Sequence, residues 1–187
     1  VIATLILLTF TGCLYDANIE PATTDLIDFK SSDLTLENGL SINKNSIILV
    51  VEYEKGKEKI EVNRNQATLN FDNHDPRVVR IQTKEKFINL KNFRAENNLL
   101  SEIPDFALQQ GIKRINVSNN RIIKLPEFNK KNTSLLLLDL SYNTKLKANS
   151  DALKKMYLPA GATLNLTKTG ISCKYIDDYM KRNPAVE

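Results

Sequence analysis

Two stretches of the chain carry the same order of apolar and polar positions, 22 residues apart. The first is L-K-N-F-R-A-E-N-N-L-L-S-E-I-P at residues 90–104, and the second is I-K-R-I-N-V-S-N-N-R-I-I-K-L-P at residues 112–126. The matched pairs are Leu90 and Ile112, Phe93 and Ile115, Ala95 and Val117, Asn98 and Asn120, Leu100 and Ile122, Ile103 and Leu125, Pro104 and Pro126, and Phe106 and Phe128. This self-similarity predicts one structural unit stacked on a copy of itself.

Two further copies follow with less regular spacing. The third, L-L-L-L-D-L-S-Y-N-T-K-L, lies 23 residues after the second and keeps an asparagine, Asn143. The fourth, G-A-T-L-N-L-T-K-T-G-I, has Thr169 where the asparagine would stand. The common frame is L-x-x-L-x-L-x-x-N-x-L over about residues 88–171, so this part of the chain resembles the leucine-rich repeat family.

The resemblance implies a short solenoid of parallel strands in a mixed α/β fold. In each x-L-x-L-x segment, the apolar residues point inward and the alternate ones outward. The asparagine that follows can bond backbone groups of a bending chain, so we expect Asn98, Asn120 and Asn143 to form a structural ladder. Pro104 and Pro126 favour an extended return segment, because proline disfavours helix at the residue before it.

The outward strand positions are the candidate functional surface. The resemblance implies a shallow binding platform for a protein or a glycan, which would use many contacts in place of one deep pocket. The expected partner-binding face consists of Asn92, Arg94, Glu96, Arg114, Asn116, Ser118, Asp139, Ser141, Asn165 and Thr167. The alternative is a structural cell-envelope protein without a soluble ligand, since strands need polar residues on their wet face in any case.

Residues 33–85 show short alternating segments that predict a small antiparallel β unit. Asn38-Gly39 is a strong hairpin dipeptide, and two β-branched segments flank a turn near Gly56. A-T-L-N-F and V-V-R-I-Q predict two more strands of this unit, separated by a turn at residues 73–76. The sequence leaves open whether the unit is a separate domain or a cap on the repeats at residues 86–171.

Helices are expected only near the end of the chain. A short helix over A-L-K-K-M-Y would replace the extended return between the third and fourth copies, with Asn149 or Ser150 as its N-cap. Within residues 172–187, a helix from Ser172 to Arg182 would close the exposed end of the stack and stop near Asn183-Pro184.

The first residues differ in composition from the rest of the chain. Residues 1–12 form an apolar run of signal-peptide length, too short to span a bilayer. The end of this run, F-T-G-C at Phe10 to Cys13, resembles the bacterial lipobox, with the small residue Gly12 before the cysteine. The resemblance implies a lipid on the Cys13 sulfur, a tether over residues 13–32, and a location at the bacterial cell envelope, on the outer membrane or cell surface. Cleaved secretion without a lipid and a buried core element are the alternatives.

Composition and charge narrow the function classes. The net charge of +4 is spread among 26 basic and 22 acidic residues without a basic run, so no nucleic-acid partner is expected. The only histidine, His74, and the two cysteines, Cys13 and Cys173, give no motif for catalysis, a metal or a cofactor. We therefore predict a non-catalytic protein, with the oligomeric state open. Cys173 is expected to be a buried free thiol, and the alternatives are an intermolecular disulfide or a reactive thiol.

Overall fold

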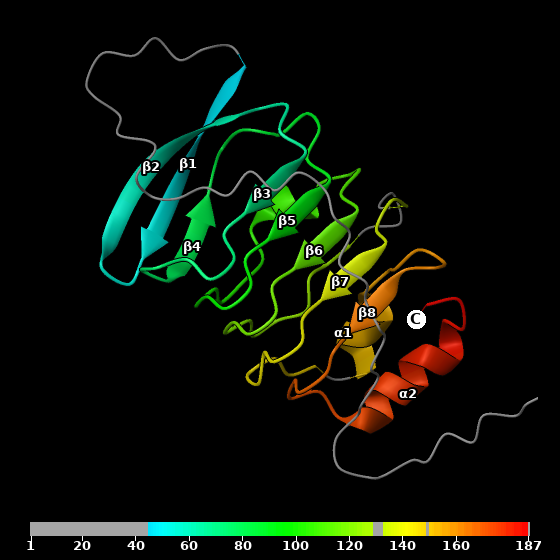
Figure 1. Ribbon diagram of the computed structural model, residues 1–187. Coiled ribbons are helices and arrows are strands. Elements are labelled where there is room, and N and C mark those ends of the chain that lie inside the picture. The colour runs from blue at the N-terminus through cyan, green and yellow to red at the C-terminus, as the bar shows by residue number, and fades with distance from the viewer. Residues whose placement is uncertain (1–44, 129–132, 149, 187) are drawn as a thin grey trace, which may run out of the picture.

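A computed structural model describes residues 45–128, 133–148 and 150–186. The expected signal peptide, Cys13, the tether and the Asn38-Gly39 hairpin lie outside these residues. The described chain forms two sheets in sequence order, an antiparallel one of three strands followed by a parallel one of five. Figure 1 shows the parallel strands side by side, with the antiparallel sheet at one end and a helix at the other.

The antiparallel sheet has the strand order β2-β1-β4, with β1 at Ser46–Tyr53, β2 at Gly56–Asn63 and β4 at Val78–Gln82. β1 alternates strictly between buried and half-buried residues, because one face covers the interior. Its inner side chains are Ile47, Leu49, Val51 and Tyr53. These three strands confirm the hairpin around Gly56 and the strand V-V-R-I-Q that the alternation predicts.

The parallel sheet has the order β3-β5-β6-β7-β8, one strand from each coil of the chain. The strands are β3 at Thr68–Asn70, β5 at Asn92–Arg94, β6 at Arg114–Asn116, β7 at Leu137–Asp139 and β8 at Thr163–Asn165. Their central residues stand in register, from Leu69 through Phe93, Ile115 and Leu138 to Leu164. The stack of parallel strands predicted from the repeat is therefore confirmed.

One strand assignment is wrong. The segment A-T-L-N-F forms a strand as predicted, but this strand, β3, pairs in parallel with β5 and belongs to the repeat sheet. The coil that starts with β3 lacks the repeat's leucine-rich spacing after the strand, because the chain leaves it to form β4. His74 occupies the position that the ladder asparagine has in later coils. Without that asparagine, the sequence does not show this segment to be an additional coil.

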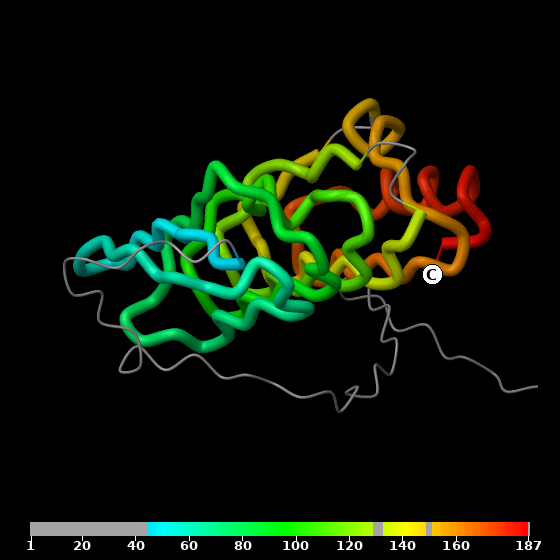
Figure 2. Tube along the Cα trace, turned by 90° about the horizontal axis from the view of Figure 1, so that it is seen from above, coloured from blue at the N-terminus to red at the C-terminus, as the bar shows by residue number. Residues whose placement is uncertain are grey.

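Among the described residues, two short helical elements lie between strands of the parallel sheet and a longer helix follows the last strand. Pro104 has extended dihedral angles and precedes a 3-10 helix, η1, at Asp105–Leu108, which the sequence analysis did not predict. The two predicted helices are present as α1 at Ser150–Lys155 and α2 at Cys173–Arg182. Seen from above in Figure 2, the coils lie between the antiparallel sheet and α2. Buried Ile176 and Tyr179 on α2 close that end of the interior.

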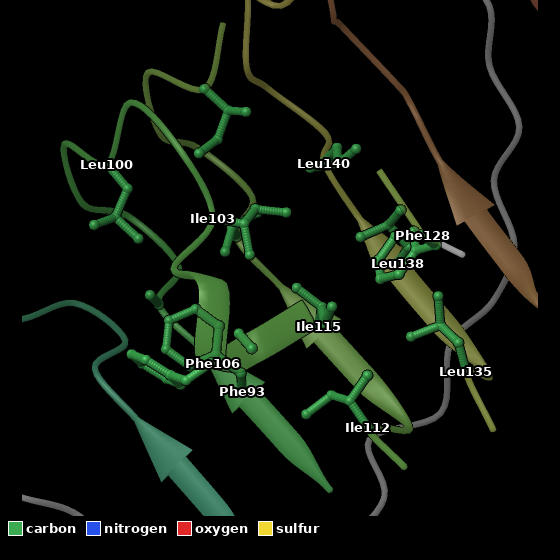
Figure 3. Close-up of a cluster of buried hydrophobic side chains, with 14 of the residues drawn as sticks. Phe93, Leu100, Ile103, Phe106, Ile112, Ile115, Phe128, Leu135, Leu138 and Leu140 are labelled. Carbon is green, nitrogen blue, oxygen red and sulfur yellow. The ribbon is translucent and has the colours of Figure 1, made fainter. Parts of the chain in front are cut away.

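A single hydrophobic core runs through the antiparallel sheet and all five coils. Figure 3 shows its central part, where Phe106 of the first return segment lies against Phe93 of β5 and Ile115 and Leu138 follow from the next two coils. The Phe93 and Phe106 rings meet edge to face with centroids 5.6 Å apart. Because no coil buries its own apolar side alone, each coil depends on its neighbours for a dry interior.

The asparagine ladder is present and joins successive coils. Asn120 donates from Nδ2 to the Ala95 carbonyl at 2.7 Å and accepts the Leu100 N–H at 2.9 Å, both in the preceding coil. Asn98 makes the same pair of bonds to Phe71 and Val78, and Asn143 makes them to Val117 and Ile122. All three asparagines are buried. Because Val78 is in β4, the first rung also fixes the antiparallel sheet to the coils.

The fourth copy replaces this bridge with a close backbone approach. Thr169 Oγ1 donates only within its own coil, to the Leu166 carbonyl at 2.8 Å. A Cβ atom on Gly170 would lie 2.9 Å from the Thr144 carbonyl oxygen and 3.0 Å from that of Leu146. The absence of a side chain at Gly170 therefore lets the last coil contact the one before it directly.

Candidate functional site

The outward strand positions form two columns along the parallel sheet, which are polar except at Leu137. The first column holds Thr68, Asn92, Arg114, Leu137 and Thr163, and the second holds Asn70, Arg94, Asn116, Asp139 and Asn165. Arg114 is exposed, whereas Asn92 and Leu137 are half-buried. Asn92 Nδ2 donates to Thr68 Oγ1 at 3.0 Å, so part of the first column is also paired within the sheet.

The second column serves mainly the backbone that follows each strand. Asn70, Asn116, Asp139 and Asn165 each accept, through Oδ1, the N–H two residues further on, at 2.9 to 3.1 Å. This local bond shapes the turn out of the strand. The sequence pattern D-L-S or N-x-S/T at these positions is therefore a turn signal first and a ligand-binding signal second.

Arg94 cannot make that bond, and an acidic residue of the preceding coil replaces it. Asp72 Oδ1 accepts the Glu96 N–H at 2.7 Å, and Asp72 Oδ2 accepts Arg94 Nε at 2.6 Å. The Asp72 side chain is only 8% exposed, so this ion pair is largely shielded from solvent. Arg94 is thus a residue that joins two coils, although 40% of its side chain stays exposed.

Three predicted contact residues are less exposed than expected. Ser118, Asp139 and Ser141 are buried, so their side chains present little surface to solvent. Ser141 Oγ donates to Asp139 Oδ1 at 2.6 Å, and Asn165 Nδ2 donates to Asp139 Oδ2 at 3.1 Å. They line the base of the surface, while Arg114, Glu96, Asn116, Asn165 and Thr167 remain exposed or half-buried.

A hollow with a volume of about 380 Å³ lies on this surface where three successive coils leave their strands. Its rim is formed by the side chains that follow the strands, and its lining consists of Glu96, Asn97, Asn116, Ser118, Asn119, Asp139, Ser141 and Tyr142. Every lining residue except Tyr142 is polar and none is basic. The hollow contains five of the ten predicted contact residues and three that the sequence analysis did not select.

Those three residues belong to a column of left-handed backbone. Asn73, Asn97, Asn119, Tyr142 and Lys168 occupy the same place in the five coils, and all have φ between 50° and 59°. Asparagine adopts this conformation more readily than most residues. The sequence signal for the column was the Asn-Asn pair repeated at residues 97–98 and 119–120, of which only the second member was assigned a role.

The amide groups of this column are linked on the surface. Asn119 Nδ2 donates to Asn97 Oδ1 at 2.5 Å, and Asn97 Nδ2 donates to Asn73 Oδ1 at 2.5 Å. The chain of amides ends at Asn119, and the next place in the column is held by Tyr142, which is 47% exposed. Lys168 Nζ lies 4.7 Å from the Tyr142 ring centroid, a cation–π contact that holds the ring from the side of the last coil.

The polar groups of the hollow differ in how many hydrogen bonds they already make within the protein. Amide N–H groups of Asn97, Asn116 and Asn119 already donate to other side chains. Within the described part of the chain, the Glu96 carboxylate accepts one side-chain bond, a long one of 3.4 Å from Asn116. Because each amide nitrogen carries two N–H groups and donates one of them here, Asn97, Asn116 and Asn119 each keep a further donor. Together with Glu96, Asn119 Oδ1 and the Tyr142 side chain, they give the hollow both acceptors and donors for a ligand.

Other reactive side chains in the described residues do not gather into a site. Burial, together with a 2.5 Å hydrogen bond to Glu58, raises the pKa of the Tyr53 phenol. His74 stacks against Tyr53 with ring centroids 4.9 Å apart, and its Nδ1 lies 3.0 Å from the Pro76 carbonyl oxygen. No group of three or more His, Cys, Asp and Glu side chains that could hold a metal ion occurs among the residues described.

Cys173 differs from its prediction. It is the first residue of α2, and it is exposed and disulfide-bonded, so the expected buried free thiol is wrong. The sequence contains one other cysteine, Cys13. The free thiol was expected because the sequence shows no identifiable partner for Cys173.

Comparisons with known proteins add no relative. No protein-family model, curated protein or solved structure matches the chain. Along the described residues, no helix combines the length and the apolar character needed to cross a bilayer.

Proposed function

We propose that this chain is a non-catalytic leucine-rich-repeat lipoprotein that binds a protein or glycan partner through the strand face of its parallel sheet. The observation that carries the proposal is the hollow of about 380 Å³, which collects side chains from three successive coils on one face. Exposed Arg114 lies on the middle one of these coils and extends the surface toward the start of the strands.

Membrane attachment through Cys13 is a second part of the proposal. It rests on the F-T-G-C resemblance to a lipobox and on the apolar run before it. Acyl chains contribute about 0.8 kcal/mol per buried CH₂, so a diacylglycerol with a further acyl chain would hold the protein on a membrane of the bacterial cell envelope. The surface of the coils would then face partners outside the bilayer.

The intact mass of the membrane-extracted protein tests the anchor. We expect a mass increase that maps to Cys13 and survives reduction. An unmodified Cys13 thiol, or a Cys13 that is released by reductant from a disulfide with Cys173, contradicts the anchor, because one sulfur cannot carry both a thioether and a disulfide. Because the sequence holds no third cysteine, a lipid on Cys13 requires that the disulfide of Cys173 join two copies of the chain.

Charge reversal at Arg114 tests the binding surface. Arg94 is unsuitable for this test, because its loss would leave Asp72 without its partner between two coils. Arg114→Glu should abolish crosslinking to a partner on intact cells, while circular dichroism and thermal midpoint stay unchanged. The matched control is Lys59→Glu on β2, an exposed lysine in the antiparallel sheet. If the unmodified protein crosslinks to no protein or glycan, the proposal fails.

A structural cell-envelope role without a soluble ligand is the second candidate. It is favoured by the second column, where the Oδ1 atoms of Asn116, Asp139 and Asn165 accept backbone N–H groups. These side chains therefore have a structural role that does not depend on a ligand. The absence of any partner that responds to Arg114→Glu would favour this candidate.

A further inference from the structure

The hollow that carries the proposed function also limits the chemistry of its ligand. Of its eight lining residues, Tyr142 is the one with a large apolar surface, and no aliphatic side chain is among them. Protein partners bind most strongly where an apolar or aromatic anchor fills a desolvated pocket. The hollow offers no such pocket for an anchor of a protein partner.

The charges of the hollow disfavour acidic ligands. Glu96 and Asp139 are its two ionisable carboxyl groups, and no lysine or arginine lines it. The Asp139 carboxylate is buried and accepts bonds from Ser141 and Asn165 through both oxygens. Glu96 is the carboxylate that a ligand can reach. A phosphate, sulfate or uronic acid group would meet the like charge of Glu96, and no cation lines the hollow itself; Lys168 lies against the Tyr142 ring at its edge.

Glu96, Asn119 Oδ1 and Tyr142 are complementary to a ligand with several hydroxyl groups and a C–H face. The carboxylate and the amide oxygen accept hydrogen bonds, which sugar hydroxyls donate. The Tyr142 ring has an electron-rich face on which the C–H groups of a pyranose ring can pack. A cation would gain less there, because Lys168 already lies 4.7 Å from the ring centroid.

The size of the hollow agrees with a short oligosaccharide. A volume of about 380 Å³ lies at the lower end of the roughly 300–1,000 Å³ that is typical of small-ligand pockets. We propose that the hollow binds a neutral oligosaccharide, with one sugar ring stacked on Tyr142 and its hydroxyl groups bonded to Glu96 and Asn119. This inference rests on the proposed binding function and names the ligand of that same surface.

The test uses an array of short neutral gluco-, galacto-, manno- and xylo-oligosaccharides, beside acidic oligosaccharides and lysine-rich peptides, probed with the full chain. We expect binding to one or more neutral oligosaccharides only. In calorimetric titration with that oligosaccharide, Tyr142→Ala should weaken binding about tenfold, which corresponds to about 1.4 kcal/mol. Tyr142→Phe keeps the ring and should bind within about twofold of the unmodified protein.

Glu96→Gln should weaken the same binding about threefold or more, because it removes the charge and replaces one acceptor oxygen with a donor. Asp177→Asn is the matched control, since it removes an exposed carboxylate from α2, at the other end of the stack. Every variant is compared only if its thermal midpoint equals that of the unmodified protein. If Tyr142→Ala unfolds, the weaker binding expected of Glu96→Gln keeps the inference testable.

Three outcomes would overturn the inference. The first is that the protein binds none of the neutral oligosaccharides. The second is that it binds only acidic oligosaccharides or lysine-rich peptides. The third is that Tyr142→Ala binds a neutral oligosaccharide as tightly as the unmodified protein does. If the array is blank but Arg114→Glu abolishes crosslinking to a cellular protein, the inference fails and the proposed function stands. If no partner of any kind is found, both fail.

Discussion

Asn120→Ala is the sharpest test of how the coils are held together. The Asn120 side chain is buried and bonds four backbone groups. Two of these groups keep a partner in the variant: the Val117 carbonyl also accepts from Asn143 Nδ2, and the Ser118 carbonyl also accepts the Asn97 N–H. The Leu100 N–H and the Ala95 carbonyl lose the bond that crosses between the coils.

The expected cost follows from those two groups. A buried donor or acceptor left unsatisfied costs about 1–3 kcal/mol, and water that enters the space of the deleted amide recovers part of this. We therefore expect Asn120→Ala to lower the free energy of unfolding by about 2–4 kcal/mol. Urea denaturation followed by circular dichroism measures this value, with the denaturant slope required to stay constant so that the midpoints can be compared.

Asn119→Gly is the matched control. Asn119 is the neighbouring residue, it is exposed, and its Nδ2 bonds only the surface amide of Asn97. Glycine tolerates its φ of 50°, so the replacement should change stability by no more than about 0.5 kcal/mol. An Asn120→Ala protein that unfolds at the unmodified urea midpoint would refute the ladder as a source of stability. Equal losses in both variants would refute the assignment of that stability to the buried bonds.

Two further predictions concern the last coil and the closing helix. Gly170→Ala should destabilise the fold by about 1–3 kcal/mol, because the added Cβ meets two backbone carbonyl oxygens at 2.9 and 3.0 Å, whereas exposed Lys174→Ala should lie within about 0.5 kcal/mol in the same denaturation assay. A Gly170→Ala protein as stable as the unmodified one would contradict the close approach. Burial raises the pKa of Tyr179 to about 12 against the opposing charge of Arg182, so above pH 10 the unfolded chain releases a proton that the folded chain keeps. The free energy of unfolding, measured by denaturation at each pH, should therefore fall between pH 10 and 12. Tyr179→Phe should reduce this fall to the part that Tyr53 causes. An unchanged pH dependence in Tyr179→Phe would contradict the burial of the phenol.

Most of the coil architecture could be predicted from the sequence, because each coil places the same residue types at nearly the same spacing. Asn98, Asn120 and Asn143 each bridge to the coil before them, which is why the asparagine recurs with the apolar residues. The first coil was missed because β4 follows it and His74 replaces the asparagine. Strand alternation alone cannot tell a parallel neighbour from an antiparallel one, so β3 was assigned to the wrong sheet.

The candidate site was harder to predict than the fold. Alternation shows which strand residues point away from the core, but not which of them the following turn covers. Asp139 and Ser141 fit the outward pattern and are nevertheless buried; they bond each other, and Asp139 also accepts from Asn165 of the next coil, at the base of the hollow. Tyr142 was placed beside the surface without a role, since its left-handed backbone and its position at the end of the amide column depend on three-dimensional geometry.

The bridging asparagines all act in one direction, and this has a consequence for biosynthesis. Each amide completes the coil that was made before it, so Leu100 has no acceptor for its N–H until Asn120 has been added, and Ile122 has none until Asn143 follows. A chain that leaves the ribosome or a translocation pore from its N-terminus therefore always carries one unfinished coil at its growing end. Completion passes along the molecule toward α2, and a chain truncated after any asparagine keeps the earlier coils closed and leaves only the last one open.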